Sequence, residues 1–187
     1  MALNELQGTP QSDTEKVNFS EYADLLKSRV PGATDFNLIS EFGRSLFTKY
    51  AFSISKVETV KDWGDRITAL THFGSNQVNS HSDSSTNQKS VINFQFLREV
   101  YLPDVWYHRM SILDQSGNPK EGDFIEQDIG GPLCFQGDYL AKGRELPKIE
   151  DGDYLIMHDT GGYTYALYSR FNSIQAPGEF SNFEPNL

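Results

Sequence analysis

Cysteine is nearly absent from this chain of 187 residues, in which Cys134 stands alone. A single cysteine excludes an internal disulfide framework and a zinc site built from several cysteines. Apolar runs are short, and none approaches the roughly 18 residues of a membrane span. The first residues carry neither the apolar stretch of a secretion signal nor the arginine-rich pattern of a transit peptide. These absences predict a cytoplasmic protein, and an organellar location stays open if the true N-terminus lies upstream.

Basic side chains are also scarce. The chain has 16 lysines and arginines against 26 acidic residues, for a formal net charge of −10. Nucleic acids and anionic membranes are bound by clustered basic residues, so we expect neither as a partner. Hydrophobic residues make up 37% of the chain and aromatic residues 13%, which predicts a folded protein rather than a disordered one.

Composition divides the chain into four segments. Residues 1–17 are polar and aperiodic, which predicts a flexible leader. Residues 18–54 read as a small α/β unit, and residues 55–176 read as β structure. The composition of residues 177–187 predicts an irregular tail. Within the α/β unit we expect a capped helix from Ser20 to the Pro31-Gly32 pair, a buried strand over Asp35–Ser40 and a second helix over Ser45–Ser53.

The β segment carries short strand patterns separated by turn residues, which is typical of an antiparallel sandwich or barrel. The strands are expected at Lys56–Val60, Asp65–Thr71, Tyr107–Leu113, Phe124–Asp128, Tyr139–Ala141, Tyr154–His158 and Tyr163–Ser169. The tight turns are expected at Asp114–Gly117, Glu150–Asp153 and Asp159–Gly162. A serine-rich stretch at about 78–95 interrupts this pattern. It indicates either an exposed polar insertion or a translated intron or similar gene-model error.

Two glycine-containing segments could bind a ligand. In Glu41-Phe-Gly-Arg44 a strand end meets a helix start, where unpaired N–H groups and a guanidinium suit an anion. A surface turn with a Glu–Arg ion pair is the plainer interpretation. In Asp159-Thr-Gly-Gly-Tyr163 two glycines allow close backbone approach and a tyrosine hydroxyl could bond a ligand. A hairpin turn with a core aromatic residue explains that segment equally simply.

Cys134 follows the rigid Gly130-Gly-Pro-Leu sequence and precedes Gly137-Asp138. A lone cysteine is more often a small buried apolar residue than a nucleophile or acid. The four histidines lack the spacing of metal ligands, so no metal site is predicted.

In this order and spacing, the three segments resemble the C-terminal part of a known family. This family is the fold-type III, pyridoxal-phosphate-dependent decarboxylases of diaminopimelate, ornithine and arginine, and the resemblance is strongest to the diaminopimelate type. It runs from about Phe36 to Ala176 and includes Arg144-Glu-Leu-Pro147 and Glu150-Asp-Gly-Asp153. It implies a mainly β fold, with a Greek-key-like antiparallel β-barrel at the C-terminal end. Residues 18–54 would then be a short α/β remnant of an N-terminal (β/α)8 barrel.

The resemblance also implies a cofactor, partners and roles for four residues. The cofactor is pyridoxal 5′-phosphate, and the enzymes are head-to-tail homodimers that act on amino acids. By motif position, Glu41 would face the pyridine nitrogen and Arg44 the phosphate, with Tyr163 also beside the phosphate. Cys134 would reach into the partner subunit's site as the catalytic acid near the decarboxylated carbon.

Three departures from the family pattern limit this implication. Phe42 stands where the family usually has proline. Phe135 stands where an acidic residue usually contacts the far end of the substrate, which leaves the substrate open. None of the nine lysines lies in a segment like that of the family's cofactor lysine. The sequence therefore indicates the C-terminal portion of a decarboxylase that is inactive alone. Alternatives are a non-catalytic β-barrel protein that binds a full-length homologue, or an unrelated β-barrel binding module.

Overall fold

The structure, a computed structural model, describes residues 18–76, 108–134, 136–162, 168–178 and 180. The expected leader at 1–17, the polar insertion at 78–95 and most of the strand expected over Tyr163–Ser169 lie outside these residues. Tyr168 and Ser169 are described and are not part of a strand.

The first element is the helix α1 (Phe19–Arg29), which confirms the helix predicted before Pro31. Its N-cap is Asn18, two residues earlier than the expected Ser20. The Asn18 side-chain oxygen accepts hydrogen bonds from the backbone N–H groups of Ser20 at 3.1 Å and Glu21 at 3.2 Å. Basic residues in the last turn complement the helix dipole.

The buried strand predicted over Asp35–Ser40 is wrong. A short 3₁₀ helix, η2 (Ala33–Asp35), covers its start, and residues 36–42 have no regular structure. The apolar side chains that suggested burial are exposed, with Phe36 at 73% and Ile39 at 90%. A strand needs neighbours to pair its backbone groups and cover its side chains, and no described strand lies beside this segment.

The second predicted helix is present but shorter than expected. It consists of α2 (Gly43–Phe47) followed by the 3₁₀ helix η3 (Thr48–Tyr50). The chain then becomes extended at Phe52, inside the predicted helix, because residues from Phe52 onward pair with the strand β6. Pairing with a neighbouring strand here outweighs the local helical pattern.

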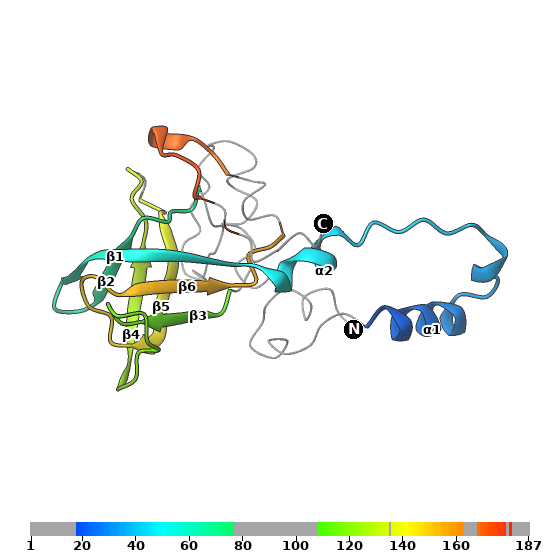
Figure 1. The fold of residues 1–187 in the computed structure, drawn as a ribbon, viewed down its shortest axis with the longest axis horizontal. Coiled ribbons are helices and arrows are strands. Elements are labelled where there is room, and N and C mark those ends of the chain that lie inside the picture. The colour runs from blue at the N-terminus through cyan, green and yellow to red at the C-terminus, as the bar shows by residue number, and fades with distance from the viewer. Residues whose placement is uncertain (1–17, 77–107, 135, 163–167, 179, 181–187) are drawn as a thin grey trace, which may run out of the picture.

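Six strands form the main body of the protein (Figure 1). They lie in the order β3-β6-β1-β2-β4-β5. Their bounds are β1 (Phe52–Asp62), β2 (Ile67–Thr71), β3 (Met110–Leu113), β4 (Phe124–Gly130), β5 (Tyr139–Pro147) and β6 (Tyr154–His158). The sheet is curled, so that β3 and β5 from its two ends contact each other. A last 3₁₀ helix, η5 (Phe171–Ser173), follows the sheet in sequence.

The mainly β prediction is confirmed, but the sheet is mixed rather than antiparallel. Strands β2 and β4 run parallel, with Thr68 opposite Asp128. The reason is the position of β3, which lies at the far edge beside β6. The chain crosses the sheet after β2 and returns as β4, which therefore runs in the same direction as β2. In addition, β5 extends well beyond the expected Tyr139–Ala141, with Gly143 at a φ of 56° inside it.

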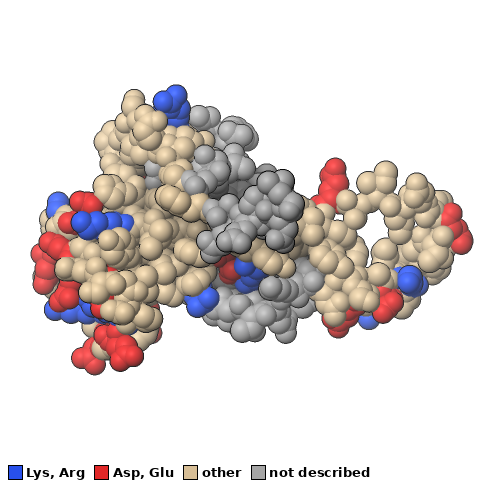
Figure 2. Space-filling view, in the orientation of Figure 1, with Lys and Arg blue, Asp and Glu red and all other residues tan. Residues whose placement is uncertain are grey.

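Alternating apolar residues from all six strands build the core, as the two-residue period of a sheet requires. The fully covered side chains include Val57, Ile129, Leu140, Leu155 and Met157. No described helix is long and apolar enough to cross a membrane. On the face shown in Figure 2, acidic and basic side chains are interspersed over the strands, without a continuous basic area among the described residues.

A charged cluster joins Lys120, between β3 and β4, to the turn between β5 and β6. The Lys120 ammonium donates to Asp153 Oδ2 at 2.6 Å and to Glu150 Oε2 at 2.9 Å, and Asp153 is only 2% exposed. Partial burial alone would lower the pKa of Lys120, but the two carboxylates outweigh it and raise that pKa. A raised lysine pKa stabilises the fold at every pH below the ordinary lysine pKa. The contribution is lost as pH rises through the folded-state pKa.

Replacing Lys120→Met is expected to lower the free energy of unfolding at neutral pH by about 2 kcal/mol, the value of a hydrogen bond between charged groups. The loss is moderate because Asp153 still accepts a hydrogen bond from the Glu150 N–H at 2.8 Å. Urea denaturation at pH 7 and again above pH 11 measures the effect, and the difference from the parent protein shrinks at the higher pH. The exposed Lys61→Met is the control. Equal losses in both variants would contradict this role for Lys120.

Candidate functional site

Residues 47–51 and residues 159–161 are joined backbone to backbone, although they are far apart in sequence. The Thr160 N–H donates to the Ala51 carbonyl at 3.0 Å, and the Gly161 N–H donates to the Thr48 carbonyl at 3.2 Å. We call this set of interactions the helix–turn contact. It lies where β1 begins and β6 ends, with Phe52 opposite His158 (Figure 1).

Side chains reinforce the helix–turn contact. The Lys49 ammonium lies 2.9 Å from Asp159 Oδ2, and both side chains are nearly buried, at 12% and 11% exposure. The Ser53 hydroxyl donates to the Thr160 hydroxyl at 3.0 Å. Asp159 has a φ of 61°, which a residue other than glycine rarely adopts without support. The ion pair with Lys49 supplies that support.

Gly161 is required by the closeness of this contact. A Cβ atom added at Gly161 would lie 1.9 Å from the Phe47 carbonyl oxygen. No side chain fits against a backbone atom at that distance. The glycine therefore allows the 159–162 turn to lie directly against the end of α2.

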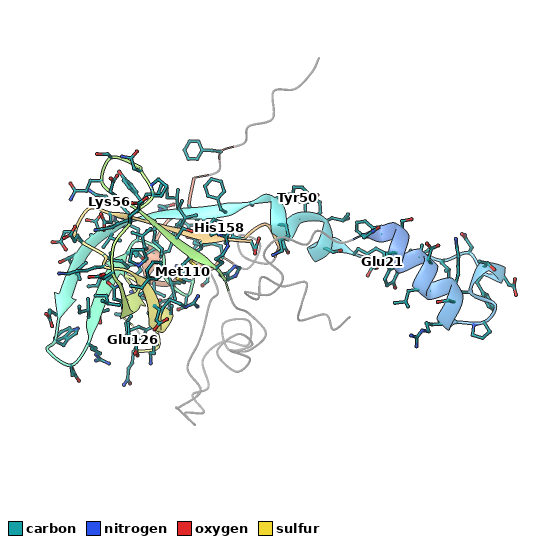
Figure 3. The ribbon with its side chains drawn as sticks, turned by 90° about the horizontal axis from the view of Figure 1, so that it is seen from below. Glu21, Tyr50, Lys56, Met110, Glu126 and His158 are labelled. Atoms are coloured by element: carbon teal, nitrogen blue, oxygen red, sulfur yellow. The ribbon has the colours of Figure 1, made fainter. Side chains whose placement is uncertain are left out.

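The helix–turn contact involves residues that follow one of the segments singled out in the sequence, Glu41–Arg44, and the first residues of another, Asp159–Tyr163. Glu41 lies just before α2 and is exposed, and Arg44 lies within α2. The turn on the other side of the contact leads directly into Tyr163, which itself lies outside the described residues. In Figure 3, Tyr50 and His158 mark the region where η3 meets the end of β6.

Phe42, which stands where the family usually has proline, has a packing role. Its ring contacts Phe19 at a centroid distance of 5.4 Å and Tyr22 at 5.0 Å, the latter edge to face. Aromatic pairs in these geometries are favourable. Phe42 thus anchors α1 beside the Glu41–Arg44 segment.

Cys134 lies in the loop between β4 and β5 and is exposed, contrary to the interpretation of a lone cysteine as a buried apolar residue. Its thiol donates a hydrogen bond to the Asn172 side-chain oxygen at 3.3 Å. Asn172 has a φ of 57°, a left-handed conformation that asparagine tolerates better than most residues. The strand directions place this loop at the same end of the sheet as the helix–turn contact.

A buried carboxylate lies four residues after the thiol. Asp138 accepts hydrogen bonds from the Ser75 N–H at 2.7 Å, the Ser75 hydroxyl at 2.9 Å and the Leu133 N–H at 2.7 Å. Burial raises the pKa of the Asp138 carboxyl, and these hydrogen bonds oppose the shift.

The described histidines have structural partners. His158 Nε2 is within hydrogen-bond distance of the Ser111 hydroxyl at 2.8 Å, and His108 Nδ1 of the His158 carbonyl at 2.7 Å. Within the described ranges, no group of three or more histidine, cysteine or acidic side chains is arranged to hold a metal ion.

Comparison with known proteins identifies the class. Residues 55–161 match the family model described as pyridoxal-dependent decarboxylase, C-terminal sheet domain. The chain belongs to this family, and the matched residues include most of β1, all of β2 to β6, the Cys134 loop and the 159–161 turn.

Similar curated proteins are diaminopimelate decarboxylases. The chain is 30% identical over 141 residues to that of Escherichia coli K12, covering 71% of this chain and 29% of the relative. It is 28% identical over 152 residues to that of Aquifex aeolicus, covering 81% and 30%. A relative from Oryza sativa, the probable diaminopimelate decarboxylase, chloroplastic, is 26% identical over 148 residues, covering 78% and 25%. The chain thus spans only about a third or less of its relatives' length.

Solved structures show the same relation. A crystal structure of diaminopimelate decarboxylase has a TM-score of 0.55 and 29% identity, covering 70% of this chain and 28% of that one. The structure of AQ1208 from Aquifex aeolicus has a TM-score of 0.62 and 27% identity, covering 81% and 32%.

Four residues of this region were not assigned roles from the sequence: Lys49, Asp159, Asp138 and Asn172. Asp138 and Asn172 lie inside the segments that carry the family resemblance, but nothing in the sequence assigns either residue a role. Lys49 and Asp159 are separated by 110 positions, and nothing in one sequence pairs them.

Proposed function

We propose that this chain is the C-terminal portion of a pyridoxal-phosphate-dependent amino-acid decarboxylase of the diaminopimelate decarboxylase type. The observation that carries the proposal is the helix–turn contact, in which the end of α2 and η3, just after the Glu41–Arg44 segment, lie against the turn that leads to Tyr163. The family match and the relatives at about 30% identity support it.

The Glu41–Arg44 segment would suit the cofactor. An added Cβ at Gly43 meets nothing within 4 Å, so there is free space beside this glycine. Arg44 would bind the phosphate, and Tyr163 would add a hydroxyl donor. Because α2 has only five residues, its dipole is small and the guanidinium would supply most of the attraction. The Glu41 carboxylate would hold a proton on the pyridine nitrogen.

The chemistry is the loss of carbon dioxide from an amino acid. Pyridoxal phosphate, when bound, supplies an electron sink that stabilises the electron pair left on the α-carbon. The Cys134 thiol would supply the proton that takes the place of the lost carboxylate. Cys134 is exposed, as a residue that serves a partner subunit's site must be.

The lysine that holds the cofactor and the rest of its pocket would come from a (β/α)8 barrel domain. Exposed apolar residues before and at the start of the sheet support such a partner. They are Phe36, Leu38, Ile39, Leu46, Phe47, Tyr50 and Phe52. The substrate stays within the class of amino acids, since Phe135 replaces the acidic residue that would select among them.

A chimera tests the proposal directly. It joins the barrel domain of the Escherichia coli diaminopimelate decarboxylase to residues 36–187 of this chain. We expect the purified dimer to release carbon dioxide from diaminopimelate, lysine, ornithine or arginine. Cys134→Ala is expected to lower kcat by about 10²-fold or more, the usual contribution of a general acid.

Two controls make the chimera informative. Pyridoxal phosphate absorbance and dimer mass, measured first, show that each variant is assembled. Lys61→Met, on the exposed surface of β1, is expected to leave kcat unchanged. If the assembled Cys134→Ala chimera is as active as the parent chimera, the thiol has no catalytic role. An assembled chimera with no activity on any of the four amino acids would favour a non-catalytic partner of a full-length homologue.

A further inference from the structure

The loop that carries Cys134 is held by several hydrogen bonds of one buried side chain, that of Asp138. Asp138 uses both carboxylate oxygens: Oδ1 accepts from the Ser75 N–H and hydroxyl, and Oδ2 accepts from the Leu133 N–H. Its own carbonyl accepts from the Gly131 N–H at 2.9 Å. The side chain is buried, at 5% exposure.

Two glycines make room for this carboxylate. A Cβ added at Gly74 would lie 2.8 Å from Asp138 Oδ1, and one added at Gly131 would lie 2.3 Å from Oδ2. The two backbones also approach each other closely, with the Gly74 Cα 2.5 Å from that added Gly131 Cβ. The site therefore fits a carboxylate and excludes a larger side chain.

The same segment also fixes the acceptor of the thiol hydrogen bond. Asn76 follows Ser75 directly. Its side-chain amide donates to the Ser169 carbonyl at 2.9 Å, and its carbonyl accepts from the Ser169 N–H at 2.9 Å. Three residues later Asn172 accepts the Cys134 hydrogen bond. The Tyr168 hydroxyl donates to the Ile174 carbonyl and so holds the 168–174 segment in its turn.

The contacts thus form a closed ring around the thiol. We propose that Asp138 is a positioning residue for Cys134: its carboxylate fixes the thiol loop to residues 74–76, and Asn76 in turn holds the segment of Asn172 through Ser169. The chemical role of the Cys134 thiol rests on the proposed function, but the position of the thiol does not. Asp138 has no contact with substrate or cofactor in this proposal and acts only through Cys134.

The variant Asp138→Asn isolates the role of the second acceptor oxygen. The amide has the same size, but one of its two polar ends donates. In either orientation that end meets a donor, from Ser75 or from Leu133, so one side of the anchor is lost. Asp128→Asn is the matched control: Asp128 is also buried and accepts one bond, from the Gly143 N–H at 2.9 Å, which an amide oxygen can keep.

Because Cys134 is the only cysteine, the full chain can be spin-labelled there without further changes. In Asp138→Asn we expect the nitroxide line shape to narrow. We also expect hydrogen exchange of the Leu133 and Ser75 amides to rise about tenfold, with the Val57 amide of the core unchanged. Ser75→Ala removes one of three hydrogen bonds and gives a smaller change. Asp128→Asn leaves both signals as in the parent.

Two results would overturn the proposal. One is an unchanged line shape and unchanged Leu133 exchange in Asp138→Asn. The other is an equal acceleration at Leu133 and Val57, which would make Asp138 a residue of general stability. Neither readout depends on pyridoxal phosphate. A chimera without activity alongside a responsive spin label would therefore reject the proposed function and leave the role of Asp138 intact.

Discussion

Gly161→Ala is expected to lower the free energy of unfolding by about 3 kcal/mol, the upper end of the cost of overpacking. The added methyl group would lie 1.9 Å from the Phe47 carbonyl oxygen, which belongs to the backbone and cannot rotate away. The 159–162 turn has to move away from η3, and the hydrogen bonds from Thr160 and Gly161 to Ala51 and Thr48 are lost.

Urea denaturation measures the loss of stability, and hydrogen exchange of the Thr160 and Gly161 amides shows whether it arises at the helix–turn contact. Gly43→Ala is the matched control within the same region. A Cβ there meets nothing within 4 Å, so stability is expected to stay the same or rise slightly. If Gly161→Ala is as stable as Gly43→Ala, the close approach of the turn to α2 is not a property of the protein.

Lys49→Met is expected to cost about 3 kcal/mol, because it leaves the Asp159 carboxylate buried without its countercharge. The cost exceeds that of Lys120→Met. Asp153 keeps a backbone hydrogen bond from Glu150 after its lysine is removed, whereas the Asp159 carboxylate accepts its hydrogen bond from Lys49 itself. The loss should be accompanied by faster exchange of the Thr160 amide, since Asp159 then has no support for its positive φ.

A second substitution separates charge burial from loss of packing. In the double variant Lys49→Met with Asp159→Asn, no unpaired charge remains, and asparagine tolerates the left-handed backbone. At least half of the lost stability is expected to return. Lys56→Met, on the exposed face of β1, is the control for removing a lysine and is expected to change stability by no more than about 0.5 kcal/mol. A double variant that is less stable than Lys49→Met would contradict the account.

The β region could be predicted closely because its signals are local. The strand Tyr154–His158 was predicted with its observed bounds, and the turn at Asp114–Gly117 forms with a φ of 84° at Gly117. Turn residues and two-residue alternation depend on neighbours in the sequence. The parallel pairing of β2 with β4 could not be predicted in this way, because it depends on where β3 inserts in the sheet.

In the N-terminal region, by contrast, the local sequence pattern predicts a buried strand that does not form. Asp35–Ser40 has the composition of a buried strand, yet Ile39 is the second most exposed of the large apolar side chains described, after Phe180. An apolar pattern shows what a segment can bury, but a neighbouring surface decides whether it does so. Sequence motifs indicated Glu41, Arg44, Cys134 and Tyr163 as candidate site residues. The structure adds Asp138, which holds the Cys134 loop, and Lys49, which pairs with Asp159, because these contacts join distant positions.

We propose that this chain carries the cofactor-facing and thiol segments of a decarboxylase and that the lysine that holds pyridoxal phosphate belongs to the barrel domain. Titration of the purified full chain with pyridoxal phosphate, followed by borohydride reduction and peptide mass mapping, tests it most directly. We expect no stoichiometric pyridoxyl group on any one of the nine lysines. One pyridoxyl group fixed to a single specific lysine, formed at low cofactor concentration, would show a complete site in this chain and contradict the account.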